Sequence, residues 1–265
     1  TWGVNVACGD VDGGAYDELL TGPGPGDVFG PQVRGFQRLG TAMGKINYFA
    51  YGTLKFGVNP ASGDVETDVY DEILTGAGPG AVFGPHVRGW NFDATAIAAI
   101  SKISFFAYPT LKYGVNVSSG DVDGDSFAEL LTGAGPGDIF GPQVRGFNFD
   151  GGTLASMGKI NFNAFSILQY GVNVAGGSVD ADNWDEIAGA PGPGPGTNWP
   201  AEFSGFNYDA ATLGPLTNFF ASPYLGWNYG GRVGLGDVSA DGPWDLLTGP
   251  GRDPAAASDV RAFRY

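Results

Sequence analysis

An acid-rich segment of nine residues recurs five times, starting at positions 10, 64, 121, 178 and 237. The clearest copy, residues 121–129, carries carboxylates at its positions 1, 3, 5 and 9. Oxygen ligands at alternate positions of a short loop suit Ca²⁺, whereas Mg²⁺ demands a stricter octahedron. Twenty of the 28 acidic residues fall inside these segments, where they would repel one another without a cation between them. We therefore expect up to five calcium loops.

The copies differ in how many oxygens they offer. We expect the tightest binding in the third and fifth copies, weaker binding in the first two, and the weakest in the fourth, which begins with Ser178 instead of a carboxylate. The predicted ligands are Asp121, Asp123, Asp125, Phe127 and Glu129 in the third copy; Asp237, Ser239, Asp241 and Asp245 in the fifth; Asp10, Asp12 and Glu18 in the first; Asp64, Asp68 and Glu72 in the second, with a longer Glu66 at its third position; and Asp180, Asp182 and Glu186 in the fourth.

The spacing of the loops predicts the fold. Their intervals of 54 to 59 residues match one blade of a β-propeller and exceed the roughly 33 to 47 residues of a helical repeat. The 47 glycines and 18 prolines disfavour helices, while a hydrophobic content of 43% suffices for a core. We predict a single all-β domain over residues 1–265, a five-bladed propeller of four-stranded antiparallel blades from repeats 1–56, 57–113, 114–170, 171–231 and 232–265. In the third repeat the expected strands are 113–118, 129–133, 143–149 and 159–165.

The last repeat supplies only three strands, expected at 232–238, 244–249 and 259–265. The fifth blade therefore has three strands, belongs to a longer protein, or receives its missing strand from another chain. An unpaired strand edge is a template for pairing. We predict that the edge from Asp259 to Tyr265 is an assembly or junction site, through which the chain can self-assemble.

Aromatic residues recur in the fourth strand of the repeats, at 48–51, 105–108, 162–165 and 219–221. We expect these rings to fill the gaps between neighbouring blades. The fourth repeat is the most divergent, and its Asn198 and Trp199 are candidates for a recognition site, because an aromatic plane beside an amide suits sugars or a protein partner. A loop that has merely drifted is the competing explanation.

Residues 121–137, followed by Pro-Gln-Val-Arg-Gly-Phe at 142–147, resemble the FG-GAP or VCBS-type repeat of integrin α-subunit propellers and of many bacterial surface proteins. The resemblance covers essentially the whole chain. It implies a propeller with Ca²⁺ bound between the first two strands of each blade, used mostly for adhesion or recognition outside the cell. Fungal sugar-binding lectins and modules attached to enzymes share this family, so the resemblance does not imply one ligand.

Several functional classes are disfavoured by the composition. A net charge of −15 disfavours nucleic acid and anionic membranes, and no apolar run approaches the roughly 20 residues that span a bilayer. The single histidine, His86, is expected in a turn, and the single cysteine, Cys8, is expected to be small and buried and has no partner for a disulfide. We therefore predict a non-enzymatic module, extracellular or on the cell surface, that binds a protein or glycan. The alternatives are a carbohydrate lectin and a non-catalytic domain of a larger secreted hydrolase or lyase.

Overall fold

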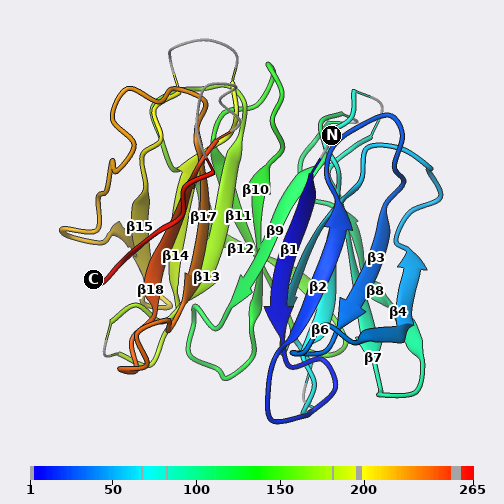
Figure 1. Cartoon of the computed structure of the whole chain (residues 1–265). Coiled ribbons are helices and arrows are strands. Elements are labelled where there is room, and N and C mark those ends of the chain that lie inside the picture. Colours follow the sequence, from blue (N-terminus) through cyan, green and yellow to red (C-terminus); the bar gives the residue numbers. More distant parts are fainter. Residues whose placement is uncertain are drawn as a thin grey trace. The chain divides into compact units, whose positions relative to one another are not determined.

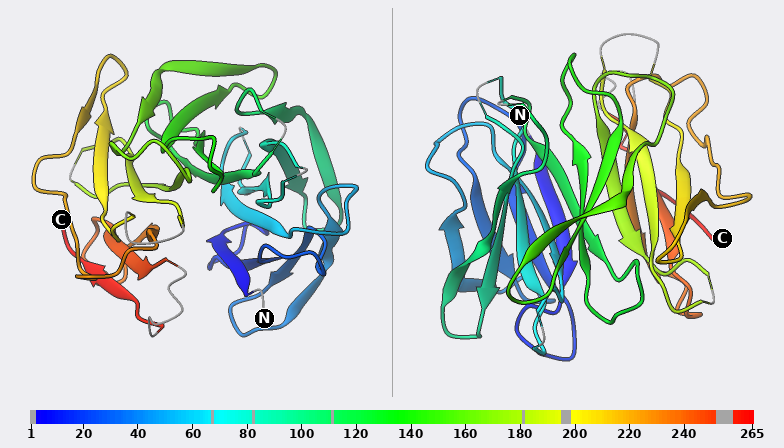
Figure 2. Two further views of the ribbon diagram at one scale, coloured as in Figure 1. Left: turned by 90° about the horizontal axis from the view of Figure 1, so that it is seen from above. Right: turned by 180° about the vertical axis from the view of Figure 1, so that it is seen from behind.

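The computed structural model describes residues 3–66, 68–81, 83–110, 112–180, 182–194, 199–251 and 258–265. These residues form five antiparallel sheets, and the described ranges contain no helix (Figure 1). Four sheets have four strands and the last has three, as predicted for a five-bladed β-propeller whose final blade is short. In each sheet the strands follow one another in sequence order, so each blade is an up-and-down meander (Figure 2).

The strand boundaries follow the repeat. The first blade contains β1 (Val4–Gly9), β2 (Glu18–Pro23), β3 (Gln32–Phe36) and β4 (Ala42–Phe49); the second β5 (Val58–Gly63), β6 (Glu72–Ala77), β7 (His86–Phe92) and β8 (Ile97–Phe106); the third β9 (Val115–Gly120), β10 (Glu129–Ala134), β11 (Gln143–Phe149) and β12 (Leu154–Asn163); the fourth β13 (Val172–Gly177), β14 (Glu186–Pro191), β15 (Ser204–Tyr208) and β16 (Leu213–Pro215); and the fifth β17 (Gly231–Gly236), β18 (Asp245–Pro250) and β19 (Arg261–Phe263).

The fourth strand of the third blade, β12, begins five residues before the predicted position 159. Its first half is mostly exposed, and Ile160 is its only fully buried residue. A strand that buries so little has no alternating apolar pattern from which its start can be read. The third strand, β11, matches the predicted residues 143–149, and more than half of its residues are buried.

The chain divides into two compact units, residues 1–118 with 148–155, and residues 119–147 with 156–265. The boundary passes through the third blade. The expectation of a single domain over residues 1–265 therefore stays a prediction.

Each of the first three blades buries four apolar residues at equivalent positions, which we call the apolar quartet. In the first blade it comprises Val11, Leu20, Val33 and Ile46, all at most 1% exposed. The isoleucine lies on the fourth strand and packs against a glycine of the third, because a Cβ on Gly35 would lie 2.9 Å from the Cβ of Ile46. Burying such a side chain contributes about 1.5 to 3 kcal/mol. The equivalent quartets are Val65, Leu74, Val87 and Ile103 in the second blade and Val122, Leu131, Val144 and Ile160 in the third.

In the first and third blades an aromatic residue of the fourth strand packs against the third strand of the next blade, as predicted, whereas residues 219–221 lie beyond the fourth strand β16 (Leu213–Pro215). Tyr48 lies 4.6 Å from Trp90, and Phe162 lies 4.6 Å from Phe206, between ring centroids. The next ring along the strand does not follow this pattern, since Phe49 and Phe106 are more than half exposed. Alternation along a strand explains the difference, because adjacent side chains point to opposite faces.

Asparagine side chains also join the first strands of neighbouring blades, a feature that sequence reasoning missed. The Nδ2 atom of Asn5 donates to the carbonyl of Val58 at 3.0 Å, and that of Asn173 donates to the carbonyl of Gly231 at 2.6 Å. Each bond gives a hydrogen-bond donor to a main-chain carbonyl in the first strand of the next blade.

Candidate metal centres

Each acidic loop joins the first strand of a blade to the second. Position 1 of the loop follows the last residue of the first strand, and position 9 is the first residue of the second strand. The strand register pairs Gly9 with Glu18 and Gly177 with Glu186, so the hairpin brings the two ends of each loop together. The sheet thus holds the ninth residue beside the first.

A buried glutamate stands at position 9 in four loops. Glu18, Glu72, Glu129 and Glu186 are at most 4% exposed. One carboxylate oxygen accepts the N–H of the valine at position 2, at 3.0 Å for Glu72 and 2.8 Å for Glu186. The other oxygen of Glu72 and of Glu186 is buried and has no hydrogen-bond partner among the described residues, and one oxygen of Glu18 is in the same state. An ionised carboxylate oxygen left this way is costly, and either a proton or a bound cation removes that cost.

The first aspartate shapes the loop. The carboxylate of Asp121 accepts the N–H groups of Gly124, Asp125 and Ser126 at 2.8, 3.1 and 3.0 Å. Gly124 has a φ of +77°, and a Cβ there would lie 2.0 Å from Nε1 of Trp184 in the following repeat. Only glycine fits both the left-handed backbone and this close approach.

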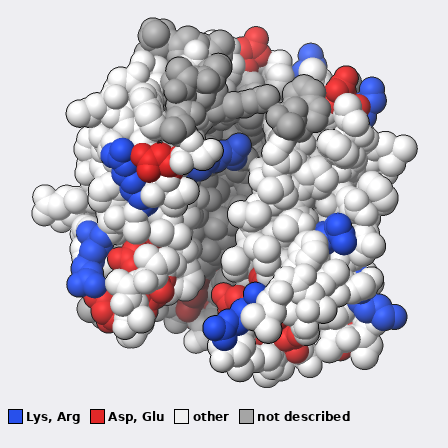
Figure 3. All heavy atoms as spheres, viewed as in Figure 1, with Lys and Arg blue, Asp and Glu red and all other residues white. Residues whose placement is uncertain are grey.

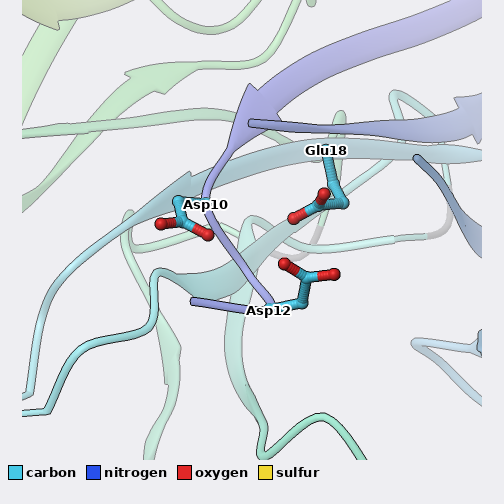
Figure 4. Close-up of side chains that lie close together, drawn as sticks. All are labelled: Asp10, Asp12 and Glu18. Atoms are coloured by element: carbon cyan, nitrogen blue, oxygen red, sulfur yellow. The ribbon is translucent and has the colours of Figure 1, made fainter. Parts of the chain in front are cut away.

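Four loops gather three carboxylates whose oxygens lie within 4.8 Å of one another. Figure 4 shows the first group, in which the carboxylates of Asp12 and Glu18 face each other with that of Asp10 beside them. Acidic side chains on the face drawn in Figure 3 accordingly lie in small separate groups and form no continuous surface. The four groups are Asp10, Asp12 and Glu18; Glu66, Asp68 and Glu72; Asp121, Asp123 and Glu129; and Asp180, Asp182 and Glu186.

The first and fourth groups contain the predicted ligands, and the other two differ from the predicted sets in one carboxylate each. In the second loop Glu66 joins the group in place of Asp64, although a buried oxygen of Asp64 also lacks a partner. In the third loop Asp125 lies outside the group of three, because its carboxylate accepts the N–H of Phe127 at 2.9 Å and closes a turn. The longer side chain of Glu66 explains the first difference, since its extra methylene carries the carboxylate further into the loop.

The fifth loop has a different arrangement from the other four. The carboxylate of Asp245, one methylene shorter than glutamate, accepts the N–H groups of Val238 and Ser239 at 3.1 and 3.0 Å. Asp241 pairs with Arg264 at 2.5 Å. No group of three carboxylates forms at Asp237, Asp241 and Asp245, all of which lie in the described ranges.

This geometry departs from the expectation that the fifth loop ranks among the best and the fourth is the weakest. The fourth loop has the same three-carboxylate arrangement as the first, whereas the fifth has none. The predicted order rested only on the number of oxygens within each loop. It could not include the ion pair with Arg264, because this residue lies outside the nonapeptide. The order of calcium affinities itself stays a prediction.

Burial raises the pKa of the four glutamates. It raises the pKa of Glu72 and Glu129 to about 8 and that of Glu18 and Glu186 to about 7. Burial is the largest cause of these pKa values, and repulsion from neighbouring carboxylates contributes to them, as Asp123 and Asp125 do for Glu129. Without a cation, these side chains therefore hold protons near neutral pH.

Neighbouring loops are joined by an aspartate at position 8. The N–H of Asp185 donates to the carbonyl of Asp121 at 2.7 Å, and the N–H of Asp121 donates to Oδ2 of Asp185 at 2.9 Å. Asp71 makes the first of these bonds to Asp10, at 2.8 Å. Burial raises the pKa of both Asp71 and Asp185 to about 6. Sequence reasoning gave this position no role, although an acid there in three of five loops was visible.

Three expectations about single residues are wrong. Cys8 is exposed, because side chains on β1 alternate and its neighbours in the strand face inward. His86 begins strand β7, with its Nε2 atom 3.1 Å from the hydroxyl of Ser104, and lies in no turn. Trp199 is 7% exposed and packs edge-on against Tyr170 at 4.7 Å, so it offers no recognition surface. The accompanying candidate Asn198 lies outside the described residues.

A cavity of about 240 Å³ adjoins the first carboxylate group. Asp12 belongs to both, and the cavity is further lined by Gln37, Met43, Lys45 and Phe92. The wall therefore combines an amide, a charged amine and a carboxylate with two apolar side chains.

The described part of the chain contains no helix of the length and apolar character that a membrane crossing requires.

Comparison with known proteins supports the fold. No family model and no curated protein matches the chain. Among solved structures, the chain is similar to a lectin from Agrocybe aegerita, studied for its specific recognition of non-reducing terminal N-acetylglucosamine, with 12% sequence identity and a TM-score of 0.52. The match covers 94% of this chain and 61% of the lectin chain. At this identity the likeness concerns the fold alone.

Proposed function

We propose that the chain is a calcium-binding β-propeller module of the FG-GAP or VCBS type that recognises a partner and performs no catalysis. The observation that carries the proposal is the repetition of one arrangement in four blades: three carboxylates within 4.8 Å, one of them a buried glutamate. Carboxylate oxygens alone, in an irregular loop, favour Ca²⁺ over transition metals.

Calcium would stabilise each blade through its first hairpin. The ion would take the buried glutamate oxygens that lack partners and relieve the repulsion between the three carboxylates of a group. Because ligands bind the folded loop and not the unfolded chain, the stability gained grows with the free calcium concentration. Calcium sites of extracellular modules reach half saturation at roughly 10⁻⁴ to 10⁻³ M, the level outside cells. An extracellular or cell-surface location is therefore part of the proposal.

The test is a calorimetric titration of chelator-treated protein with CaCl₂ and, separately, MgCl₂, combined with thermal unfolding. We expect four calcium ions per chain, a melting temperature that rises with calcium, and a weaker response to magnesium. Glu129→Gln removes the buried ligand of the third loop and should leave three ions bound. Asp27→Asn changes an exposed acid outside the loops and should leave four. Absence of calcium uptake, or a melting temperature that ignores the chelator, would refute the proposal.

A second candidate function is glycan binding, favoured by the cavity beside Asp12. Sugar sites commonly pair an apolar wall with polar side chains, and Phe92, Gln37 and Lys45 provide such a combination here. The structural likeness to a lectin is compatible with this role but rests on the fold alone.

A glycan array that includes N-acetylglucosamine-terminated oligosaccharides tests this candidate. Lys45→Ala should weaken any binding by at least about tenfold if the cavity is the site. Lys159→Ala is the matched control, because Lys159 occupies the equivalent position in the third repeat and does not line this cavity. An array without binding, or equal loss in both variants, would remove the candidate.

A further inference from the structure

The first acidic loop lacks an acidic side chain that the other four have. Position 5 of the nonapeptide is an acid at residues 68, 125, 182 and 241, but in the first copy it is Gly14. A Cβ on Gly14 would lie 2.7 Å from Oδ1 of Asp12, so a side chain at position 5 would begin beside this carboxylate. Because Ca²⁺ takes six to eight oxygens, the oxygens that the first loop does not supply are missing on the side of Asp12.

The remaining carboxylates of this loop still form a group that suits a cation. Glu18 is 4% exposed, and its Oε2 atom is buried without a hydrogen-bond partner among the described residues. Figure 4 shows the carboxylate of Glu18 facing that of Asp12, with Asp10 beside them. The buried Glu18 closes one side of the group, whereas Asp12 also borders the cavity described above.

The cavity has the size and the lining of a site for a small polar ligand. Its volume of about 240 Å³ lies just below the roughly 300 to 1,000 Å³ of pockets for larger ligands, so it suits a single sugar ring. Gln37 and Lys45 line it with exposed polar ends, and the half-buried Met43 adds an apolar surface. A ligand in the cavity therefore meets an amide, an amine and the carboxylate of Asp12 together.

Two basic side chains lie beside this acidic loop. Lys45 lines the cavity, and the guanidinium of Arg38 lies 4.2 Å from the ring centroid of Tyr16, at position 7 of the loop. Within the described ranges neither Lys45 nor Arg38 forms an ion pair. Once a bound cation neutralises the carboxylates, these two positive charges favour an anion at the cavity.

We propose that this cavity binds the carboxylate of an acidic sugar, such as a uronic acid, whose charge is shared by Lys45 and the calcium ion of the first loop. The proposal rests on the calcium binding proposed above, and it narrows the glycan candidate for this cavity to acidic sugars. The sugar carboxylate supplies the oxygens that position 5 lacks, and the amide of Gln37 binds the hydroxyl groups. Without calcium, Asp12 repels the ligand, so binding depends on the metal.

The test compares two sugars that differ in one group, methyl β-D-glucuronide and methyl β-D-glucoside, by saturation-transfer NMR titration of the calcium-saturated chain. We expect saturable binding of the glucuronide, at least about tenfold weaker binding of the glucoside, and no binding of either in EDTA. Lys45→Ala should weaken glucuronide binding at least about tenfold. Lys159→Ala, at the equivalent position of the third repeat, is the control and should bind like the wild type.

A second variant separates the sugar from the metal. Gly14→Asp supplies the missing acid, so the first loop should keep its calcium and lose the glucuronide. The substitution fits the backbone, because Gly14 has no positive φ and its new Cβ meets only the end of the Asp12 side chain. Calorimetric calcium counts and melting temperatures of each variant are measured alongside.

The outcomes distinguish this inference from the proposed function. A chain that takes up no calcium refutes both, whereas four bound calcium ions without glucuronide binding overturn this inference alone. Equal binding of the glucoside, binding that persists in EDTA, or wild-type binding by Lys45→Ala or by folded Gly14→Asp would also overturn it. Tighter binding of N-acetylaspartate, which mimics an acidic peptide side chain, would assign the cavity to a protein partner and overturn it as well.

Discussion

Calcium binding should release protons, because the position-9 glutamates of the metal-free protein are protonated near neutral pH. Burial raises the pKa of Glu72 and Glu129 from the ordinary 4.5 to about 8. At pH 7 each of these carboxyls is about nine-tenths protonated, and the two with a pKa of about 7 are about half protonated. Since calcium requires the ionised form, filling four loops should release about three protons per chain at pH 7.

Calorimetry in pairs of buffers with different ionisation enthalpies measures this number directly. At pH 9 the same glutamates are nearly all ionised, so the release should fall well below one proton. Glu129→Gln should lower the release at pH 7 by about one proton, while Asp27→Asn should not change it. A release near zero at pH 7, or one that is equal at pH 7 and pH 9, would show that the glutamates are not the ligands.

The raised pKa values of the position-9 glutamates also determine how the stability of the metal-free protein depends on pH. The folded-state pKa lies above the unfolded value of 4.5, so the folded chain holds more protons than the unfolded chain between about pH 4.5 and 8. The metal-free protein should therefore be most stable near pH 4.5 and lose stability as the pH rises to about 8. The calcium-loaded protein should show the opposite trend, because protons compete with the metal as the pH falls.

Three other predictions concern the loops. The double substitution Asp245→Glu with Arg264→Ala lengthens the ninth side chain and frees Asp241, so calorimetry should count five ions, and a count of four would contradict the explanation of the fifth loop. Asp185→Ala leaves the N–H of Asp121 without its acceptor and should weaken calcium binding in the third loop several-fold, as measured by titration, while unchanged affinity would argue against coupling between neighbouring loops. Gly124→Ala places a Cβ against Trp184 at a φ of +77° and should lower the free energy of unfolding by about 1 to 3 kcal/mol in urea titration, which wild-type stability would disprove.

Much of the fold could be read from the sequence because repetition multiplies weak signals. A single short run of mixed polar and apolar residues such as 143–149 is ambiguous, but the same run in successive repeats, each bounded by glycine turns, defines a strand. The start of β12 could not be read, because a strand with one buried side chain leaves no pattern. The burial of Trp199 depends on Tyr170, which lies in the preceding strand connection, a contact that no local pattern indicates.

The sequence by itself determined the acidic loops, their period and the three-stranded last blade, because ligand spacing and strand number are local properties of the chain. Only the tertiary structure decided which carboxylates meet. Glu66 replaces Asp64 in the second group, and Arg264, which follows strand β19, pairs with Asp241 of the fifth loop. The reason is physical: a metal site depends on distances between side-chain atoms, and these are set by strand register, side-chain length and neighbours far along the chain.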